Sequence, residues 1–237
     1  MIKEAIYIGW DPRQIAAYAV ARYTLRRALT RAIPIMPLIL DRLREAELYR
    51  RDVVMGQEGQ LWDPISLAPM STEFAISRFL VPHLMKSGWA LYMDCDVLIR
   101  HNVSPLFYLM DESKAVYVVK HNYIPPGAKK MDGREQWVYG RKNWSSVMLF
   151  NCDHPANRAL TLEMINTRPG RDLHQFCWLK DEDIGEISPE WNYLVGHTKD
   201  VPDPTIVHFT EGGPWLPKYA DCEYADEWWN RLKEWSS

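Results

Sequence analysis

The amino-acid sequence predicts an α/β fold with a mostly parallel mixed sheet flanked by helices. Three observations lead to this prediction. Runs rich in β-branched and aromatic residues alternate with segments of helical periodicity, and turns with Gly or Pro separate these segments. The length of 237 residues is sufficient for one hydrophobic core. A hydrophobic content of 47% and a charged content of 25% exclude disordered and fibrous classes. We therefore expect a single domain over residues 1–237, with a C-terminal aromatic helical segment over 215–237 packed on it.

Predicted strands and helices alternate along the chain. The predicted strands are residues 5–8, 35–40, a run ending at 94, and residues 115–120, 145–150 and 206–209. The predicted helices are one capped by Asp11 with Pro12 as its first residue, a short one at Ser104 and Pro105, and helices over 71–80, 155–167 and 172–179. Two glycines and two prolines predict a loop over 51–70. Near the C-terminus, Trp228, Leu232 and Trp235 share one helical face, which favours docking on the core.

Charge and cysteine content narrow the classes of function. The net charge of -3 disfavours a general nucleic-acid binder, although cations gather over residues 129–142. Four cysteines without paired spacing are typical of free thiols in a reducing compartment. The first residues lack the apolar core of a signal peptide, and no run approaches the ~18 apolar residues of a membrane span. We therefore expect a cytoplasmic protein without a transmembrane segment.

An Asp-x-Asp motif after an apolar strand is the most informative feature of the chain. Asp94 and Asp96 are two residues apart, so in an extended segment both carboxylates point to the same face and can share one divalent cation. In open α/β sheets, ligands bind at the carboxyl ends of the strands, where the turn at residues 9–11 also falls. The sequence therefore predicts a metal-dependent nucleotide site at this edge. The competing interpretation of the motif is ordinary loop and cap chemistry.

Five segments occur in a characteristic order along the chain. They are residues 7–11 (YIGWD), 74–78 (FAISR), 91–97 (LYMDCDV), 147–151 (VMLFN) and 208–215 (HFTEGGPW). In this order they resemble the retaining glycosyltransferases of GT-A fold that include glycogenin and bacterial lipooligosaccharide galactosyltransferases. The resemblance implies a single GT-A, Rossmann-like domain. It also implies a glycosyltransferase that moves a hexose from UDP-glucose or UDP-galactose to a hydroxyl acceptor with retention of configuration.

The same resemblance implies a set of site residues. The metal ligands would be Asp94, Asp96 and His208, and an imidazole among oxygen ligands favours Mn²⁺, with Mg²⁺ as the alternative. The implied nucleotide-binding residues are Gly9, Trp10, Asp11, Arg78, Cys95, Gly212, Gly213 and Lys218. The implied sugar-binding residues are His121, Ser145, Ser146 and His174. Gln175 is the implied catalytic residue, beneath the anomeric carbon. Three of these residues also have a purely structural interpretation. Asp11 could be a helix N-cap, Arg78 could form a surface ion pair, and His208 could be a buried histidine whose hydrogen bonds are satisfied.

Two positions depart from the family pattern. His174 precedes Gln175 where the family has Asp before Gln, which leaves the identity of the donor sugar open. The family's lysine before Pro-Trp is missing, and Lys218 or a lysine of residues 129–142 would replace it as the cation for the diphosphate. Because Gln175 and its neighbours offer no obvious carboxylate nucleophile, we favour attack on the same face as the leaving group. In that reaction the leaving phosphate oxygen takes the acceptor proton.

The predicted partners are a nucleotide-sugar donor and a saccharide, glycolipid or other hydroxyl acceptor. Residues 121–143 combine cationic side chains with Tyr123, Trp137 and Tyr139, so we expect the acceptor to bind there. A nucleic-acid acceptor ranks below a saccharide because the net charge of the chain is weak. A phosphohydrolase of the haloacid dehalogenase type is an alternative, because its nucleophile motif also follows an apolar strand. A non-catalytic nucleotide-sugar-binding partner subunit is the alternative from a different class.

Overall fold

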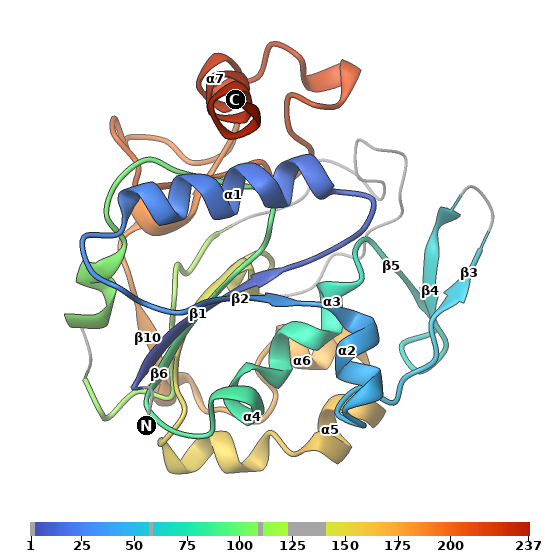
Figure 1. The fold of residues 1–237 in the computed structure, drawn as a ribbon. Helices are drawn as coiled ribbons and strands as arrows, with labels where there is room; N and C mark the ends of the chain where they lie inside the picture. Colours follow the sequence, from blue (N-terminus) through green and yellow to red (C-terminus); the bar gives the residue numbers. More distant parts are fainter. Residues whose placement is uncertain (1–2, 57–58, 109–110, 123–140) are drawn as a thin grey trace.

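A six-stranded mixed sheet runs through the centre of the computed structural model, which describes residues 3–56, 59–108, 111–122 and 141–237 (Figure 1). Its strands, in spatial order, are β10 (Ile184–Glu186), β8 (Val116–Val118), β9 (Val147–Asn151), β6 (Trp89–Met93), β1 (Glu4–Gly9) and β2 (Ile35–Leu38). β1 is parallel to β2 and β6, and β8 is parallel to β10, whereas β9 is antiparallel to both of its neighbours. The predicted mostly parallel mixed sheet is therefore confirmed.

Helices cover both faces of this sheet. The α-helices are α1 (Ile15–Ala28), α2 (Leu40–Glu45), α3 (Phe74–Ser77), α4 (Val81–Met85), α5 (Leu162–Thr167), α6 (Gly170–His174) and α7 (Ala225–Ser236). The 3-10 helices are η2 (Arg78–Leu80), η3 (Ser104–Tyr108), η4 (Trp144–Ser146), η5 (Pro155–Ala159), η6 (Asp181–Asp183), η7 (Pro189–Asn192) and η8 (Pro217–Tyr219). Figure 1 shows α1 on one face and α3, α4 and α6 on the other, with α7 stacked outside α1. Within the described residues, no helix combines the length and apolarity that crossing a membrane requires.

Alternation along β1 explains why the sheet is buried on both sides. Ile6 and Ile8 pack with Leu25 of α1, whereas Ala5 and Tyr7 belong to the cluster on the α3–α6 side. A strand covered on both faces is apolar at nearly every position, as the sequence of β1 is. Outside α1, the side chain of Trp228 in α7 is fully buried in a third cluster that includes residues of α1, β7 and β12.

Two small sheets complete the fold. In the first, β12 (Ile206–His208) is the middle strand, antiparallel to β7 (Val97–Ile99) and parallel to β11 (Tyr193–Leu194). β3 (Val54–Met55), β4 (Leu61–Asp63) and β5 (Ala68–Met70) form the second small sheet. The predicted loop over 51–70 is therefore wrong. Strands of two or three residues carry too little periodicity to be recognised, and long-range bonds rather than local pattern hold this sheet.

Those long-range bonds centre on a buried arginine. Arg51 forms an ion pair with Asp63 at the end of β4, and both side chains are almost completely buried. Arg51 also donates to the carbonyl oxygens of Ile165 and Arg168, at 2.9 and 2.7 Å. Ser66 accepts a hydrogen bond of 2.7 Å from the backbone N–H of Gly170 at the start of α6. The small sheet is thus fixed to the α5–α6 segment.

Four predicted helices need correction. The one predicted over 71–80 begins at Phe74 as α3 and continues from Arg78 as the 3-10 helix η2. The first helix begins at Ile15 with Gln14 as its N-cap, because Asp11 instead accepts from the N–H of Arg13 in a tight turn before the helix. The predicted helix over 155–167 is two helices, since the side chain of Thr161 caps a new start at α5. The predicted helix over 172–179 ends at His174, and Phe176 adopts a positive φ of 55° that no α-helix continues.

Candidate active site

Three side chains of the kinds that bind metal ions meet at the carboxyl end of β6. Asp94 follows β6, Asp96 precedes β7, and His208 ends β12. The antiparallel register places His208 opposite Val97, next to Asp96, and its Nε2 lies 3.5 Å from Asp96 Oδ1. One ligand atom from each of the three residues lies within 4.8 Å of the others. Among the residues that the structure describes, this is the one group of His, Cys, Asp or Glu with such geometry.

Asn192 sets the orientation of the His208 ring. This fully buried side chain donates from Nδ2 to Ser146 Oγ at 2.8 Å, and its Oδ1 lies 3.1 Å from His208 Nδ1. An amide oxygen only accepts, so Nδ1 of His208 carries a hydrogen and Nε2 is the ring nitrogen that faces the aspartates. Two carboxylates and an imidazole form a donor set that fits a divalent transition ion.

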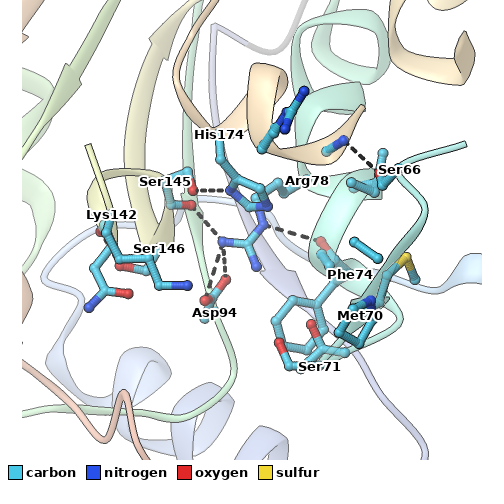
Figure 2. A pocket seen from close by; sticks show the side chains of 18 of the residues that line it. Ser66, Met70, Ser71, Phe74, Arg78, Asp94, Lys142, Ser145, Ser146 and His174 are labelled. Atoms are coloured by element: carbon cyan, nitrogen blue, oxygen red, sulfur yellow. Dashed lines mark hydrogen bonds and ion pairs between the residues drawn. The ribbon is translucent and has the colours of Figure 1, made fainter. Parts of the chain in front are cut away.

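Arg78 holds the first aspartate in place. Its Nη1 lies 2.9 Å from Asp94 Oδ1 and donates to the carbonyl oxygen of Ser145 at 2.8 Å (Figure 2). Tyr92 donates from its hydroxyl to Asp94 at 2.6 Å. Arg78 is buried, so the interpretation as a surface ion pair is wrong. Burial, together with the nearby Asp96 carboxylate, raises the pKa of Asp94 above its ordinary value although Arg78 opposes this. A bound cation would favour the ionised form of this carboxyl.

A cavity of about 400 Å³ opens onto these residues (Figure 2). Its lining includes Asp94, Asp96 and His208, and it includes Ser145, Ser146 and His174 of the predicted sugar-binding residues. His174 Nδ1 lies 2.6 Å from Ser145 Oγ, which joins α6 to the start of β9. The predicted catalytic residue, Gln175, is the C-cap of α6 and is not among the described lining residues; its backbone oxygen accepts from Arg141.

His121 interacts electrostatically with His208, although it is not among the described residues that line the cavity. Burial lowers its pKa to about 3, and His208 is the second cause, so its imidazole is neutral at neutral pH. Its Nε2 is buried and makes no hydrogen bond within the described part of the chain. The carbonyl oxygen of His121 accepts from the indole N–H of Trp144 at 2.9 Å. The residue therefore keeps one polar atom available near the site.

The turn after β1 is tightly packed rather than open. A Cβ at Gly9 would come within 2.5 Å of the Phe74 ring, which explains the glycine. Asp11 is fully buried, and its carboxylate accepts from the Arg13 side chain and from the backbone N–H groups of Arg13 and Glu73. Burial would raise the pKa of Asp11, but these hydrogen bonds outweigh it and hold the pKa below its ordinary value. Trp10 beside it is half-buried.

Comparison with a curated relative shows the family of the chain. No model of a known protein family matches it. It is 44% identical over 237 residues to Protein CDI of Arabidopsis thaliana, and the match covers 98% of this chain and 86% of that protein. The chain belongs to the Protein CDI family.

Several solved structures similar to this CDI family member are glycosyltransferases. The WbbM bifunctional glycosyltransferase superposes with a TM-score of 0.65 at 12% identity over 96% of this chain, and GlyE of Streptococcus pneumoniae TIGR4 with 0.63 at 16% over 100%. This chain spans about half of the WbbM chain, 49%, and 62% of GlyE. The galactosyltransferase LgtC with donor and acceptor sugar analogues gives 0.59 at 16%, covering 98% of this chain and 96% of LgtC. The expected GT-A fold is therefore confirmed.

The remaining predicted nucleotide-binding residues of this CDI family member lie at different depths. Cys95 is buried between the two aspartates, with its Sγ 3.1 Å from Gln14 Oε1. Gly212 and Gly213 follow β12, and a Cβ at Gly213 would lie 2.0 Å from the Trp215 ring. Lys218 is exposed on η8 and is not among the described residues that line the cavity.

Gly212 lines a second cavity of about 370 Å³, which also has Phe209 and Thr210 in its lining. It has a φ of 144°, and a Cβ there would lie 2.9 Å from the Tyr219 ring, so glycine is required. His197 and Glu211 pair at 2.7 Å in the same cavity, and Thr210 lines both cavities. The segment after His208 thus separates two hollows.

Sequence reasoning missed part of the first cavity. Its lining also includes Thr210, Arg171 and the apolar residues of 65–76. Of the last group, residues 65–70 fell in the predicted loop, where no periodic signal marked them. Lys142, by contrast, lines the cavity and belongs to the basic segment that the missing family lysine had already singled out.

Proposed function

We propose that the chain is a metal-dependent glycosyltransferase that moves a hexose from UDP-glucose or UDP-galactose to a hydroxyl acceptor with retention of configuration. The cluster of Asp94, Asp96 and His208 in a cavity at the carboxyl edge of the sheet carries this proposal, because ligands of open α/β sheets bind at this edge. The fold shared with LgtC, whose structure holds donor and acceptor sugar analogues, supports it.

The cluster would hold Mn²⁺, with Mg²⁺ as the alternative. When bound, such an ion supplies positive charge where the departing diphosphate becomes negative. Arg78 keeps the Asp94 carboxylate aimed at the cluster, and Asn192 keeps His208 Nε2 there. Lys142 lines the same cavity and would replace the missing family lysine as a cation for the diphosphate.

The lining also bears on the stereochemical course. Apart from Asp94 and Asp96, the described lining residues include no Asp or Glu, so none offers a carboxylate for double displacement. This supports attack on the same face, with the acceptor proton passing to the leaving phosphate oxygen. The catalytic role of Gln175 stays a prediction. His174, bonded to Ser145, presents an imidazole in place of the family's aspartate and would contact hydroxyls of the transferred sugar.

The acceptor surface predicted over 121–143 lies mostly outside the described residues, including Tyr123, Lys129, Lys130, Trp137 and Tyr139. It stays a prediction, as do the saccharide or glycolipid acceptor and the cytoplasmic location. A haloacid dehalogenase-type phosphohydrolase is not favoured, since Asp94 follows β6 rather than the first strand and the similar structures are glycosyltransferases. A silent binding subunit is not favoured either, because the three ligands are assembled.

Calorimetric titration of the full chain with UDP-, GDP- and TDP-sugars, with and without Mn²⁺, tests the proposal. We expect UDP-sugars to bind in the presence of Mn²⁺ and to bind weakly after chelation. Slow release of free sugar from the bound donor would show that the site is catalytic. Preferential binding of a GDP-sugar, or binding that ignores the metal, would contradict the proposal.

A further inference from the structure

The first cavity has two chemically different ends. Asp94, Asp96, His208 and Arg78 form a polar end, which the proposed donor would occupy. Another part of the lining comes from the β4–β5 connection, β5 and α3, and it is mainly apolar, with Ser66, Ser71 and Thr72 among its residues. The apolar members that form this wall include Ile65, Leu67, Ala68, Pro69, Met70 and Ile76. The diphosphate and hexose of the proposed donor are polar, so they are not the groups that these apolar side chains suit.

An exposed apolar row leads from this wall across the small sheet. Val54 pairs directly with Trp62, and Trp62 pairs directly with Pro69, so the three side chains lie on one face of the β3–β4–β5 sheet. Val54 is 49% exposed and Trp62 is 36% exposed, while Pro69 is half-buried and lines the cavity. Their neighbours on the opposite face of β4 and β5, Leu61 and Met70, are buried. Figure 1 shows β3 and β4 at the margin of the molecule, away from α1 and α7.

Leu67 extends this row at the rim of the cavity. Its side chain is 70% exposed, and its φ of 49° lies in the left-handed region that a leucine seldom adopts. A single exposed leucine is common on protein surfaces. Leu67, however, lines the cavity together with Pro69, and its backbone adopts an unfavourable conformation at this position. The buried pair of Arg51 and Asp63 fixes the turn that carries it.

We propose that Val54, Trp62, Leu67 and Pro69, the apolar strip, bind the apolar part of the acceptor. The acceptor is then an amphipathic molecule, a hydroxyl-bearing head joined to an alkyl or aryl tail. Continuity with the cavity wall selects this occupant, because a tail that emerges from the cavity meets Leu67 and Pro69 first and Trp62 and Val54 next.

This proposal rests on the proposed function. In the reaction, the acceptor oxygen bonds to the anomeric carbon, and the bond from that carbon to the diphosphate breaks with its electron pair. The diphosphate oxygen takes the acceptor proton, so no further reactant is needed.

Calorimetry with octyl β-glucopyranoside and methyl β-glucopyranoside, which share a head and differ in tail, tests the apolar strip. The full chain is titrated in the presence of Mn²⁺ and UDP. The concentration of the octyl compound is kept below the value at which it forms micelles. We expect the octyl compound to bind about tenfold or more tightly, because burial of the added methylenes is favourable. The double variant Trp62→Ser, Leu67→Asn should abolish this difference, and Asn suits the backbone of residue 67. Trp235→Ser, which removes an exposed tryptophan on α7, is the matched control and should retain it.

Each other outcome overturns the proposal. Equal affinities, or no binding of the octyl compound, would show that the apolar strip holds no tail. Binding to phosphatidylcholine vesicles that the double variant loses would assign it to a membrane surface. A dimer seen by light scattering that the double variant loses would assign it to a second copy of the chain. UDP binding in the presence of Mn²⁺ is measured on the same samples. Loss of UDP binding would contradict the proposed function, whatever the result with the two glucosides.

Discussion

Asn192 Oδ1 lies 3.1 Å from His208 Nδ1, and this contact determines which imidazole nitrogen faces the two aspartates. The same side chain donates to Ser146 Oγ, so one buried amide links the end of β12 to the turn that begins β9. Residues that hold a metal ligand from behind in this way commonly affect metal affinity almost as much as the ligand does.

Replacement of Asn192 by Leu should weaken Mn²⁺ binding about 10- to 100-fold, because His208 loses the partner that fixes its tautomer and orientation. Asn192→Asp keeps an acceptor for His208 Nδ1 and should lose less. Calorimetric titration with Mn²⁺ alone measures both variants. Equal losses in the two variants would show that Asn192 acts only through packing.

Asp96→Asn should lower transfer about 100-fold or more and leave the fold nearly intact. Asp96 is the better choice for this test because Asp94 also pairs with buried Arg78, whose charge would be stranded by a change there. Donor turnover and the thermal midpoint of the apoprotein are the two measurements. Full activity in this variant, or in the chelated wild-type protein, would rule out the proposed metal site.

Lys142→Ala should weaken UDP binding about tenfold, since it removes a cation from the lining of the cavity. Lys218→Ala is the control, because Lys218 is exposed outside that lining, and its affinity should remain unchanged. Titration with UDP and Mn²⁺ compares the two. The reverse pattern would assign the diphosphate cation to Lys218, as the resemblance first suggested.

Asp63→Ala should lower the free energy of unfolding by about 3–5 kcal/mol, because it leaves the buried charge of Arg51 without its partner. Glu163→Ala provides a matched control: it breaks an ion pair with Arg50 whose side chains are more than half exposed, and should cost at most about 1 kcal/mol. Urea denaturation measures both. Similar costs for the two variants would mean that the Arg51 pair does not anchor the small sheet.

Asp11→Asn should lower the free energy of unfolding by about 1–3 kcal/mol at neutral pH, because hydrogen bonds from Arg13 and Glu73 stabilise the carboxylate. The pKa of Asp11 lies below its ordinary 3.8 in the folded protein, so the advantage of the wild-type protein is present above 3.8. It is lost as the pH falls through the lowered pKa. Urea denaturation from about pH 7 to about pH 3 should show the two proteins converge. A constant difference would contradict the assignment.

The local sequence pattern was sufficient to predict structure where residues that are neighbours in the chain share one environment. The apolar run of β1 predicts a strand because both of its faces are covered. Asp94 and Asp96 were recognisable as a pair of candidate metal ligands, because residues that are two apart on an extended segment point to the same face. The order of the five segments then indicated His208 as their partner, and the pairing of β12 with β7 agrees with that expectation.

The sequence by itself determined the α/β fold, the aspartate pair and the basic segment that supplies Lys142. Only the tertiary structure decided the three-stranded sheet over 54–70, the link from Asn192 to His208 and the apolar wall of the cavity. Each of these depends on contacts between residues distant in the chain, such as Arg51 with the carbonyl oxygens of Ile165 and Arg168. Periodicity records which face of a segment is buried, but the partner that buries it is chosen only when the whole chain packs.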